Sequence, residues 1–298
     1  MTDSGVKSCR YVATAGMFDG VHRGHQFLLR QLAAEAHRRS LQPLVFTFSR
    51  HPLEIIAPQR APKLLTTPGQ RIDLIRELSG IEHVELLDPT PEFLRTTGRA
   101  FLEGLHRDHR VDAFAMGFNN HIGSDGATAA TLDNDAPVDI IALPEMESDE
   151  PVNSTAVRSA LTSGDINAAE RILGHRWQYR GKVVGGKRLG RTIGFPTANI
   201  EGERSGLIMP PNGVYAVDIT LPDGLTRRGM ANIGCRPTVD APGSPATLEV
   251  NIFGFGSNIY GAAADITFLR RLRDEKPFAN LEELRRQLEA DRSAAEII

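Results

Sequence analysis

Residues 15–25 read Ala-Gly-Met-Phe-Asp-Gly-Val-His-Arg-Gly-His. This stretch follows an apolar run, Tyr11–Ala15, that predicts a strand, and it precedes an amphipathic segment, Gln26–Arg39, that predicts a helix. Glycines in such a turn let the backbone approach a ligand closely, and the helix N-terminus offers unpaired N–H groups to a phosphate. The stretch therefore predicts a polyphosphate site. A glycine-rich turn with two surface histidines is the alternative interpretation, which the strand–turn–helix context disfavours.

The first half of the chain alternates short apolar runs with helical periodicity, and this alternation predicts a parallel α/β sheet. In such sheets, ligands bind beyond the carboxyl ends of the strands, where the turn 15–25 and the segment Gly117–Gly126 are expected. The expected strands are Tyr11–Ala15, Leu44–Phe48, Val84–Leu87, Ala113–Met116 and Val138–Leu143, and the expected helices are Gln26–Arg39, Pro68–Leu78 and Arg99–Arg107.

The second half of the chain has a different sequence pattern. Residues 154–174 predict two short helices, with Ser154 or Thr155 as the first N-cap and Gly164 at its end. From Tyr179 onward, short β-rich runs punctuated by Gly and Pro predict a small antiparallel barrel, which a charged helix, Leu281–Asp291, closes. We therefore expect two domains, residues 1–175 and 176–298.

Composition excludes several classes of protein. The 298 residues carry a formal net charge of −3, and no basic block predicts a nucleic-acid surface. No apolar stretch approaches the ~20 residues that span a bilayer, and the first residues lack the apolar core of a signal peptide. The two cysteines, Cys9 and Cys235, are expected to be reduced thiols. We expect a cytoplasmic protein, either a monomer or a weak homo-oligomer.

A second cluster of chemically informative residues spans 185–199, Gly-Gly-Lys-Arg-Leu-Gly-Arg-Thr-Ile-Gly-Phe-Pro-Thr-Ala-Asn. Glycines, basic side chains and hard oxygen ligands occur together there, as a site for Mg²⁺ and phosphate requires. The glycines are Gly185, Gly186 and Gly190, the cations are Lys187, Arg188 and Arg191, and the oxygen ligands are Thr197 and Asn199. The i, i+2 spacing of the two oxygen ligands predicts that both face one side of an extended strand.

Glu249 alternates with Leu248 and Val250 and is therefore expected to face away from them. A carboxylate in that position is a candidate general base, although a solvated strand face is the more common explanation. Arg273 and Glu275 lie in a polar segment that predicts either a loop closing over a substrate or an ordinary turn.

Three motifs in this order resemble the family of bifunctional bacterial riboflavin kinase/FMN adenylyltransferases, also called FAD synthetases. The motifs are residues 16–25, Asn-Ser-Thr-Ala-Val-Arg at 153–158 and Gly-Arg-Thr-Ile-Gly-Phe-Pro-Thr-Ala-Asn at 190–199, with further matches at 211–217, 232–238, 248–253 and 272–278. The resemblance implies an N-terminal nucleotidyltransferase domain with a Rossmann-like parallel sheet. It also implies a C-terminal riboflavin kinase β-barrel with a terminal helix. The implied ligands are ATP, Mg²⁺ and the flavins riboflavin, FMN and FAD.

With this resemblance we assign the candidate site residues. The catalytic candidates are Glu249, His22 and His25; the nucleotide-binding candidates are Gly16, Phe18, Asp19, Gly24, Ser154, Thr155, Arg158, Gly185, Lys187, Gly190, Arg191 and Thr197; the flavin-binding candidates are Asn119, Phe195, Arg273 and Glu275; and the metal ligands are Thr197 and Asn199. The chain departs from the family pattern at Asn119 and Ile122, where an acid and a phenylalanine are usual, and at Asn153, where a serine is usual.

The two implied reactions make different chemical demands. Phosphorylation of riboflavin uses a neutral hydroxyl, so a base such as Glu249 is useful. Transfer of AMP to FMN uses an anionic phosphate, so alignment and stabilisation of the leaving pyrophosphate by His22 and His25 suffice. The alternatives are a kinase alone with a weakened or regulatory N-terminal domain, a flavin-binding protein without turnover, and a cytidylyltransferase.

Overall fold

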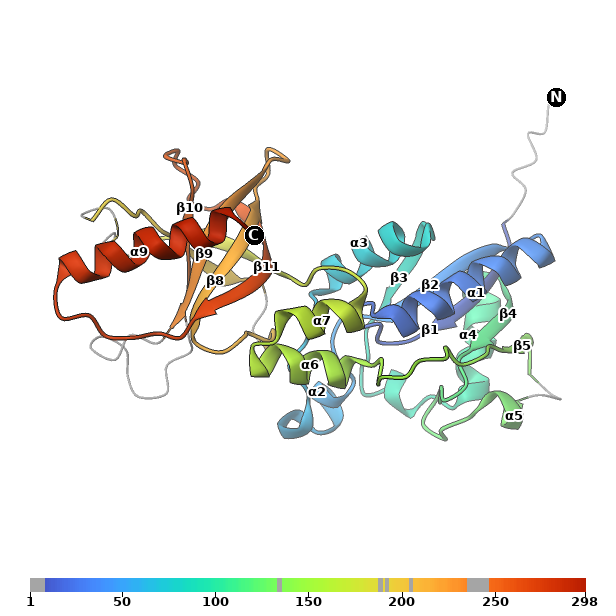
Figure 1. Ribbon diagram of the computed structural model, residues 1–298. Helices are drawn as coiled ribbons and strands as arrows, with labels where there is room; N and C mark the ends of the chain where they lie inside the picture. Colours follow the sequence, from blue (N-terminus) through green and yellow to red (C-terminus); the bar gives the residue numbers. More distant parts are fainter. Residues whose placement is uncertain (1–8, 133–135, 187–189, 191–192, 204–205, 235–246) are drawn as a thin grey trace, which may run out of the picture. The chain divides into compact units, whose positions relative to one another are not determined.

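The computed structural model describes residues 9–298 except 133–135, 187–189, 191–192, 204–205 and 235–246 (Figure 1). The chain forms two compact units. Unit 1 comprises Met1–Pro62 with Pro68–Pro151, and unit 2 comprises Lys63–Thr67 with Val152–Ile298. Each unit has its own core.

Unit 1 is built on a five-stranded parallel sheet in the order β3-β2-β1-β4-β5. The order reverses direction between β1 and β4, which makes the carboxyl ends of these two strands the expected ligand crevice. The predicted parallel sheet and each of its predicted strands are confirmed. The bounds are β1 Tyr11–Ala15, β2 Gln42–Phe48, β3 His83–Leu87, β4 Val111–Met116 and β5 Asp139–Ala142.

Helices cover both faces of this sheet (Figure 1). Consecutive β1 residues point to opposite faces, so Val12 joins a core with Leu29 of α1 and Ile75 of α3, whereas Ala13 joins the core that contains Leu102 of α4. Burial on both faces explains why the strands are apolar runs. The helices are α1 Arg23–Arg39, α2 Leu53–Ile56, η1 Pro58–Arg60, α3 Pro68–Ser79, η2 Phe93–Arg95, α4 Gly98–His109 and α5 Ala129–Leu132.

Unit 2 contains a closed barrel in the order β10-β7-β6-β11-β8-β9, in which all neighbouring strands are antiparallel. The predicted barrel is therefore confirmed. Its strands are β6 Gln178–Val184, β7 Ala198–Gly202, β8 Gly213–Thr220, β9 Thr226–Gly234, β10 Thr247–Ile252 and β11 Ala263–Arg273, and its helices are α6 Ser154–Ser163, α7 Ile166–Leu173 and α9 Leu281–Glu296. Helix α9 lies on the outer surface, where Ala295 packs with Ala216 and Leu269.

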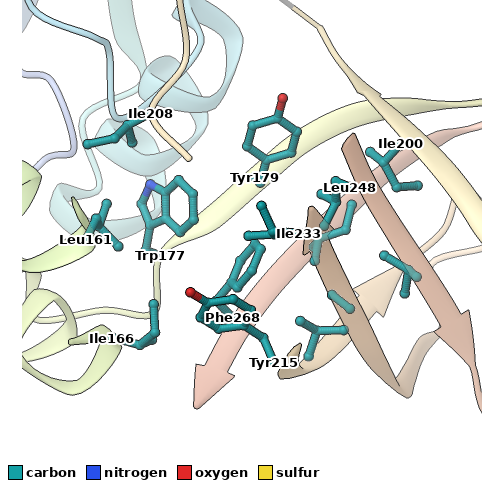
Figure 2. Close-up of a cluster of buried hydrophobic side chains, with 14 of the residues drawn as sticks. Leu161, Ile166, Trp177, Tyr179, Ile200, Ile208, Tyr215, Ile233, Leu248 and Phe268 are labelled. Carbon is teal, nitrogen blue, oxygen red and sulfur yellow. The ribbon is translucent and has the colours of Figure 1, made fainter. Parts of the chain in front are cut away.

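The core of unit 2 continues from the barrel into α6 and α7. Figure 2 shows Leu161 of α6 and Ile166 of α7 beside Trp177, in the same cluster as the barrel residue Phe268. The Trp177 indole N–H donates to the Leu65 carbonyl at 2.9 Å, so the segment Lys63–Thr67 contributes to this core as well.

Two helix starts differ from the sequence-based expectation. Helix α1 begins at Arg23 rather than Gln26, because the His22 side chain serves as its N-cap. The expected N-cap of α6 at Ser154 or Thr155 is wrong: the cap is Asn153, whose side-chain oxygen accepts from the Ala156 N–H at 2.8 Å. Asparagine is as good an N-cap as serine, so this departure from the family pattern preserves the helix start. Within the described ranges, no helix is long and apolar enough to cross a bilayer.

The domain boundary at residues 175–176 stays a prediction. It places α6 in the first domain, and a change in α6 tests whether this helix instead shares one core with the barrel. We expect Leu161→Ala to lower the free energy of unfolding of unit 2 by about 2–5 kcal/mol, because Leu161 is fully buried in the core cluster that α6 shares with the barrel. Urea unfolding followed by the fluorescence of Trp177, the single tryptophan, measures this. Ser159→Ala, at an exposed position of α6, is the matched control. An unchanged midpoint in Leu161→Ala would show that α6 is independent of the barrel.

Candidate active sites

The turn between β1 and α1 in unit 1 has an unusual backbone. Phe18 and Val21 have φ angles of 48° and 42°, values that side chains other than glycine rarely adopt. Such strain persists only where surrounding contacts enforce it. The amide of buried Gln26 donates to the Val21 carbonyl at 2.9 Å, and the Thr47 hydroxyl donates to the Met17 carbonyl at 3.0 Å. The turn is therefore fixed at both ends.

The buried Arg71 of α3 also stabilises the region next to this turn. Its side chain is fully buried, and it donates to the Thr47 hydroxyl at 3.1 Å and to the Phe48 carbonyl at 2.7 Å. These bonds tie α3 to the carboxyl end of β2. They also bring a guanidinium charge close enough to His25 to lower the pKa of that histidine.

The H-x-G-H spacing brings the two imidazoles together. His22 is the N-cap and His25 lies in the first turn of α1, and the two rings stack with centroids 3.6 Å apart. His22 Nδ1 accepts from the His25 backbone N–H at 3.3 Å. Burial, His22 and Arg71 hold the pKa of His25 well below 6.5, so its ring is neutral at neutral pH. The His25 Nδ1 is enclosed and has no hydrogen-bond partner among the described residues.

Other candidates of the turn lie beside these rings. The position of Gly16 is constrained, because a Cβ there would lie 3.1 Å from the Phe18 ring. Phe18 stacks edge-on against His25, with ring centroids 5.1 Å apart, and Asp19 is buried. Gly24 is in the first turn of α1, between the two histidines in the sequence.

A cavity of about 600 Å³ opens at the same end of the sheet. Its lining is largely aromatic and apolar, and it includes the turn that precedes the histidines. The residues are Ala15, Gly16, Met17, Phe48, Pro52, Ile56, Phe93, Leu94, Thr96, Phe101, Asn120, His121, Ile122, Gly123 and Ser124. Asn119, the sequence-based flavin candidate, is exposed and does not line this cavity, whereas its neighbour Asn120 does.

The sequence reasoning missed the aromatic wall of this cavity. Phe48, Phe93 and Phe101 meet edge to face, with ring centroids 5.9 and 5.8 Å apart. They come from three separate segments, and no local motif joins them.

The remaining adenylyltransferase candidates belong to unit 2. Ser154, Thr155 and Arg158 lie in the first half of α6, at its N-terminal end. Thr155 is exposed, and the other two are partly exposed. The adenylyltransferase candidates are therefore divided between the two units: the histidine turn lies in unit 1, and these three residues lie in unit 2.

The barrel places the candidate base on its outer surface, as the sequence alternation predicts. Leu248 and Val250 are buried in the core, and Glu249 faces outward between Asn199 of β7 and Asn232 of β9, which lie directly opposite it on the neighbouring strands. The Thr197 hydroxyl donates to the Glu249 carboxylate at 3.0 Å. Thr197 lies just before β7 and Asn199 lies in it, so the predicted pair and Glu249 form one cluster.

Close packing of glycines shapes the loop around this cluster. A Cβ on Gly186 would lie 2.0 Å from the Asn199 side chain, and a Cβ on Gly190 would lie 2.1 Å from the Phe195 carbonyl oxygen. Phe195 is buried, whereas Gly185 has open space around it. The expected cations of this loop, Lys187, Arg188 and Arg191, lie outside the described residues.

The two flavin candidates at the end of β11 and just beyond it have protein partners. Arg273 forms a bidentate ion pair with Asp291 of α9, with N–O distances of 2.8–3.0 Å. Glu275 accepts from the Asn232 amide at 3.3 Å and lies against Gly234, where a Cβ would be 1.9 Å from its carboxylate. Both side chains are therefore held in place by contacts within unit 2.

A second cavity, of about 300 Å³, lies next to Thr197. The wall is formed by strand residues and by the loop that follows β10, and the lining residues are Val183, Pro196, Thr197, Ala198, Val250, Ile252, Phe255, Gly256, Ser257, Asn258, Ile259 and Tyr260. Among the described residues, no group of three His, Cys, Asp or Glu side chains could hold a metal ion.

Comparisons with known proteins agree with this organisation. The family model described as FAD synthetase matches residues 6–156, and the one described as riboflavin kinase matches residues 173–298. The bifunctional riboflavin kinase/FMN adenylyltransferase of Escherichia coli K12 is 36% identical over 293 residues, 95% of this chain and 91% of the relative. The Bacillus subtilis protein of the same name is 33% identical over 97% of this chain and 92% of the relative. The chain belongs to the bifunctional riboflavin kinase/FMN adenylyltransferase family.

A solved structure extends this likeness to the whole fold. The crystal structure named as a macrolide-efflux protein from Streptococcus pneumoniae is 33% identical, with a TM-score of 0.85 over 97% of this chain and 94% of that chain. The two-part architecture is therefore shared over nearly the entire length.

The lowered pKa of His25 predicts a pH dependence of stability. Below pH 6.5 the unfolded chain binds a proton at this position that the folded chain does not. The free energy of unfolding should therefore fall with decreasing pH by up to ~1.4 kcal/mol per unit, until the folded-state pKa is reached. Urea unfolding followed by circular dichroism at several pH values measures the slope. His25→Gln should flatten it relative to His37→Gln, a change of an exposed histidine in the same helix. Equal slopes in the two variants would contradict this assignment.

Proposed function

We propose that this chain phosphorylates riboflavin to FMN in unit 2 and transfers AMP from ATP to FMN in unit 1, forming FAD and releasing pyrophosphate. The names of its relatives describe both reactions, and matches to both family models support the two activities in one chain. The observation that carries the proposal is the hydrogen bond between Thr197 and Glu249. It joins a candidate base to the motif proposed to bind nucleotide.

In the kinase reaction, the ribityl hydroxyl of riboflavin attacks the γ-phosphorus of ATP and loses its proton. We assign Glu249 as the acceptor of that proton, because it is the carboxylate that the barrel directs outward beside Thr197. The hydrogen bond from Thr197 holds one carboxylate oxygen in place. The bond to the leaving ADP breaks as the new phosphate ester forms.

The residues around Glu249 fit a magnesium ion. The Thr197 proton points to Glu249, so the lone pairs of its oxygen are available to a cation, and the Asn199 side chain adds an amide oxygen. We propose that Thr197 and Asn199 hold Mg²⁺. When bound, the ion would neutralise charge on the phosphates of ATP. The cavity beside Thr197 is the proposed nucleotide pocket.

In the adenylyl transfer, a phosphate oxygen of FMN attacks the α-phosphorus of ATP, and pyrophosphate leaves. The nucleophile is already anionic, so no base is required. His22 Nδ1 accepts a hydrogen bond, which leaves Nε2 as the N–H donor of the neutral ring. This N–H and the N-terminus of α1 support a role in stabilising the departing charge. The aromatic cavity supports flavin binding in unit 1.

Two other functions remain as alternatives to test. A flavin-binding protein without turnover has no use for Glu249 held by Thr197, and a kinase alone has no use for the strained turn and the stacked histidines. Chromatography of products after incubation with riboflavin, ATP and Mg²⁺ separates the three: FAD, FMN alone, or neither. The cytoplasmic location and the state of assembly stay predictions.

Glu249→Gln should lower FMN formation by about 10²–10⁴-fold, because the amide cannot accept the proton. Binding of ATP should be retained, which equilibrium dialysis measures. Glu201→Gln, at an exposed carboxylate on β7, is the matched control and should keep full activity. Turnover near the wild-type rate in Glu249→Gln would remove Glu249 from this role.

His22→Asn should lower FAD formation from supplied FMN by about 10²–10³-fold and leave FMN formation unchanged. Asparagine keeps the N-cap acceptor of α1 and removes only the imidazole, so the helix start is preserved. The kinase rate of the same sample is the internal control. If FAD formation continues unchanged, the imidazole of His22 has no part in the transfer.

A further inference from the structure

Asn251 lies on β10 two residues after Glu249, on the same outward face of that strand. Its side chain is only 7% exposed, and its amide N–H₂ donates to the Pro196 carbonyl at 2.6 Å. Pro196 directly precedes Thr197. One face of β10 therefore contacts the nucleotide motif twice, through the carboxylate of Glu249 and through the amide of Asn251.

The register of the barrel explains why this bond forms. Glu249 is opposite Asn199 and Val250 is opposite Ala198, so Asn251 reaches the segment just before β7. Pro196 has no N–H, and the backbone ladder between β7 and β10 cannot continue through it. The Pro196 carbonyl therefore accepts its hydrogen bond from the Asn251 side chain and not from a backbone N–H of a neighbouring strand.

We infer that Asn251 is a positioning residue of the kinase site, holding the Pro196–Thr197 segment so that the Thr197 hydroxyl stays aligned with Glu249. The inference rests on the proposed kinase function. Pro196 and Thr197 also line the 300 Å³ cavity, so the same bond fixes one wall of the proposed nucleotide pocket. The sequence gives no sign of this role, because Asn251 alternates with core residues like any outward strand position.

The test variant is Asn251→Asp, which keeps the side-chain shape and replaces the donor with a carboxylate that repels the Pro196 carbonyl. Asn251→Ser removes the bond without adding charge, and it replaces Asn251→Asp if that variant does not fold. Thr267→Val is the matched control: Thr267 is 8% exposed on β11 and accepts from Gln178, away from the motif. It reports the effect of losing an equally buried polar contact in the barrel.

Two measurements do not need turnover. We expect hydrogen–deuterium exchange in the peptide 193–200 to become faster in the Asn251 variants and to stay unchanged in Thr267→Val. We expect the Kd for Mg·ADP, measured by calorimetry, to rise about tenfold, the size of an ordinary hydrogen-bond contribution. Unchanged exchange and unchanged Kd in a folded Asn251 variant would overturn the inference.

Kinetics separate positioning from loss of folded protein. We expect the KM for ATP to rise and kcat to fall in the Asn251 variants, while the KM for riboflavin changes less than about twofold. A fall in kcat with both KM values unchanged, matched by Thr267→Val, would mean a structural role alone and would overturn the inference. If wild-type protein forms no FMN, the proposed function fails. Hydrogen–deuterium exchange and Mg·ADP binding then still test whether the Asn251–Pro196 hydrogen bond holds the Pro196–Thr197 segment.

Discussion

The two-residue period of a β-strand is the constraint on which the barrel site depends. Leu248 and Val250 must enter the core, so Glu249 between them must face outward. Antiparallel pairing then brings Asn199 and Asn232 to the same level on either side of it. A slip of one residue would bury the carboxylate and expose the core residues, so the folding of the barrel also places the Glu249 side chain.

The site of unit 1 depends in a similar way on the geometry of a helix. Residues three apart on a helix are neighbours, and the H-x-G-H spacing therefore stacks His22 on His25 at the start of α1. The contacts that hold the preceding turn come from strand β2 and helix α3. The Thr47 hydroxyl donates to the Met17 carbonyl in the turn, and Arg71 donates to the Phe48 carbonyl at the end of β2. Arg71 also contributes to keeping His25 neutral.

Features with a local period could be predicted from the sequence, and features made by topology could not. The apolar runs predict the strands of both units, and the alternation around Glu249 predicts its outward side chain. The aromatic cavity wall could not be predicted, because Phe48, Phe93 and Phe101 are brought together only by the order of the strands. The contact of Asn251 could not be predicted for the same reason, since its partner, Pro196, is fifty-five residues away in the sequence. The capping role of Asn153 shows that a substituted motif position can keep its structural task.

The hydrogen bond from Trp177 to Leu65 has a consequence for how this chain can be made and divided. The segment Lys63–Thr67 belongs to unit 2, although unit 1 precedes and follows it. During synthesis it leaves the ribosome long before the barrel strands that complete its core exist. The core around Leu65 therefore stays incomplete until the residues from Val152 onward have been synthesised. A single cut between Pro151 and Val152 leaves Leu65 on the fragment that carries unit 1. Gene fusion or exchange at one junction would separate a core residue from its core.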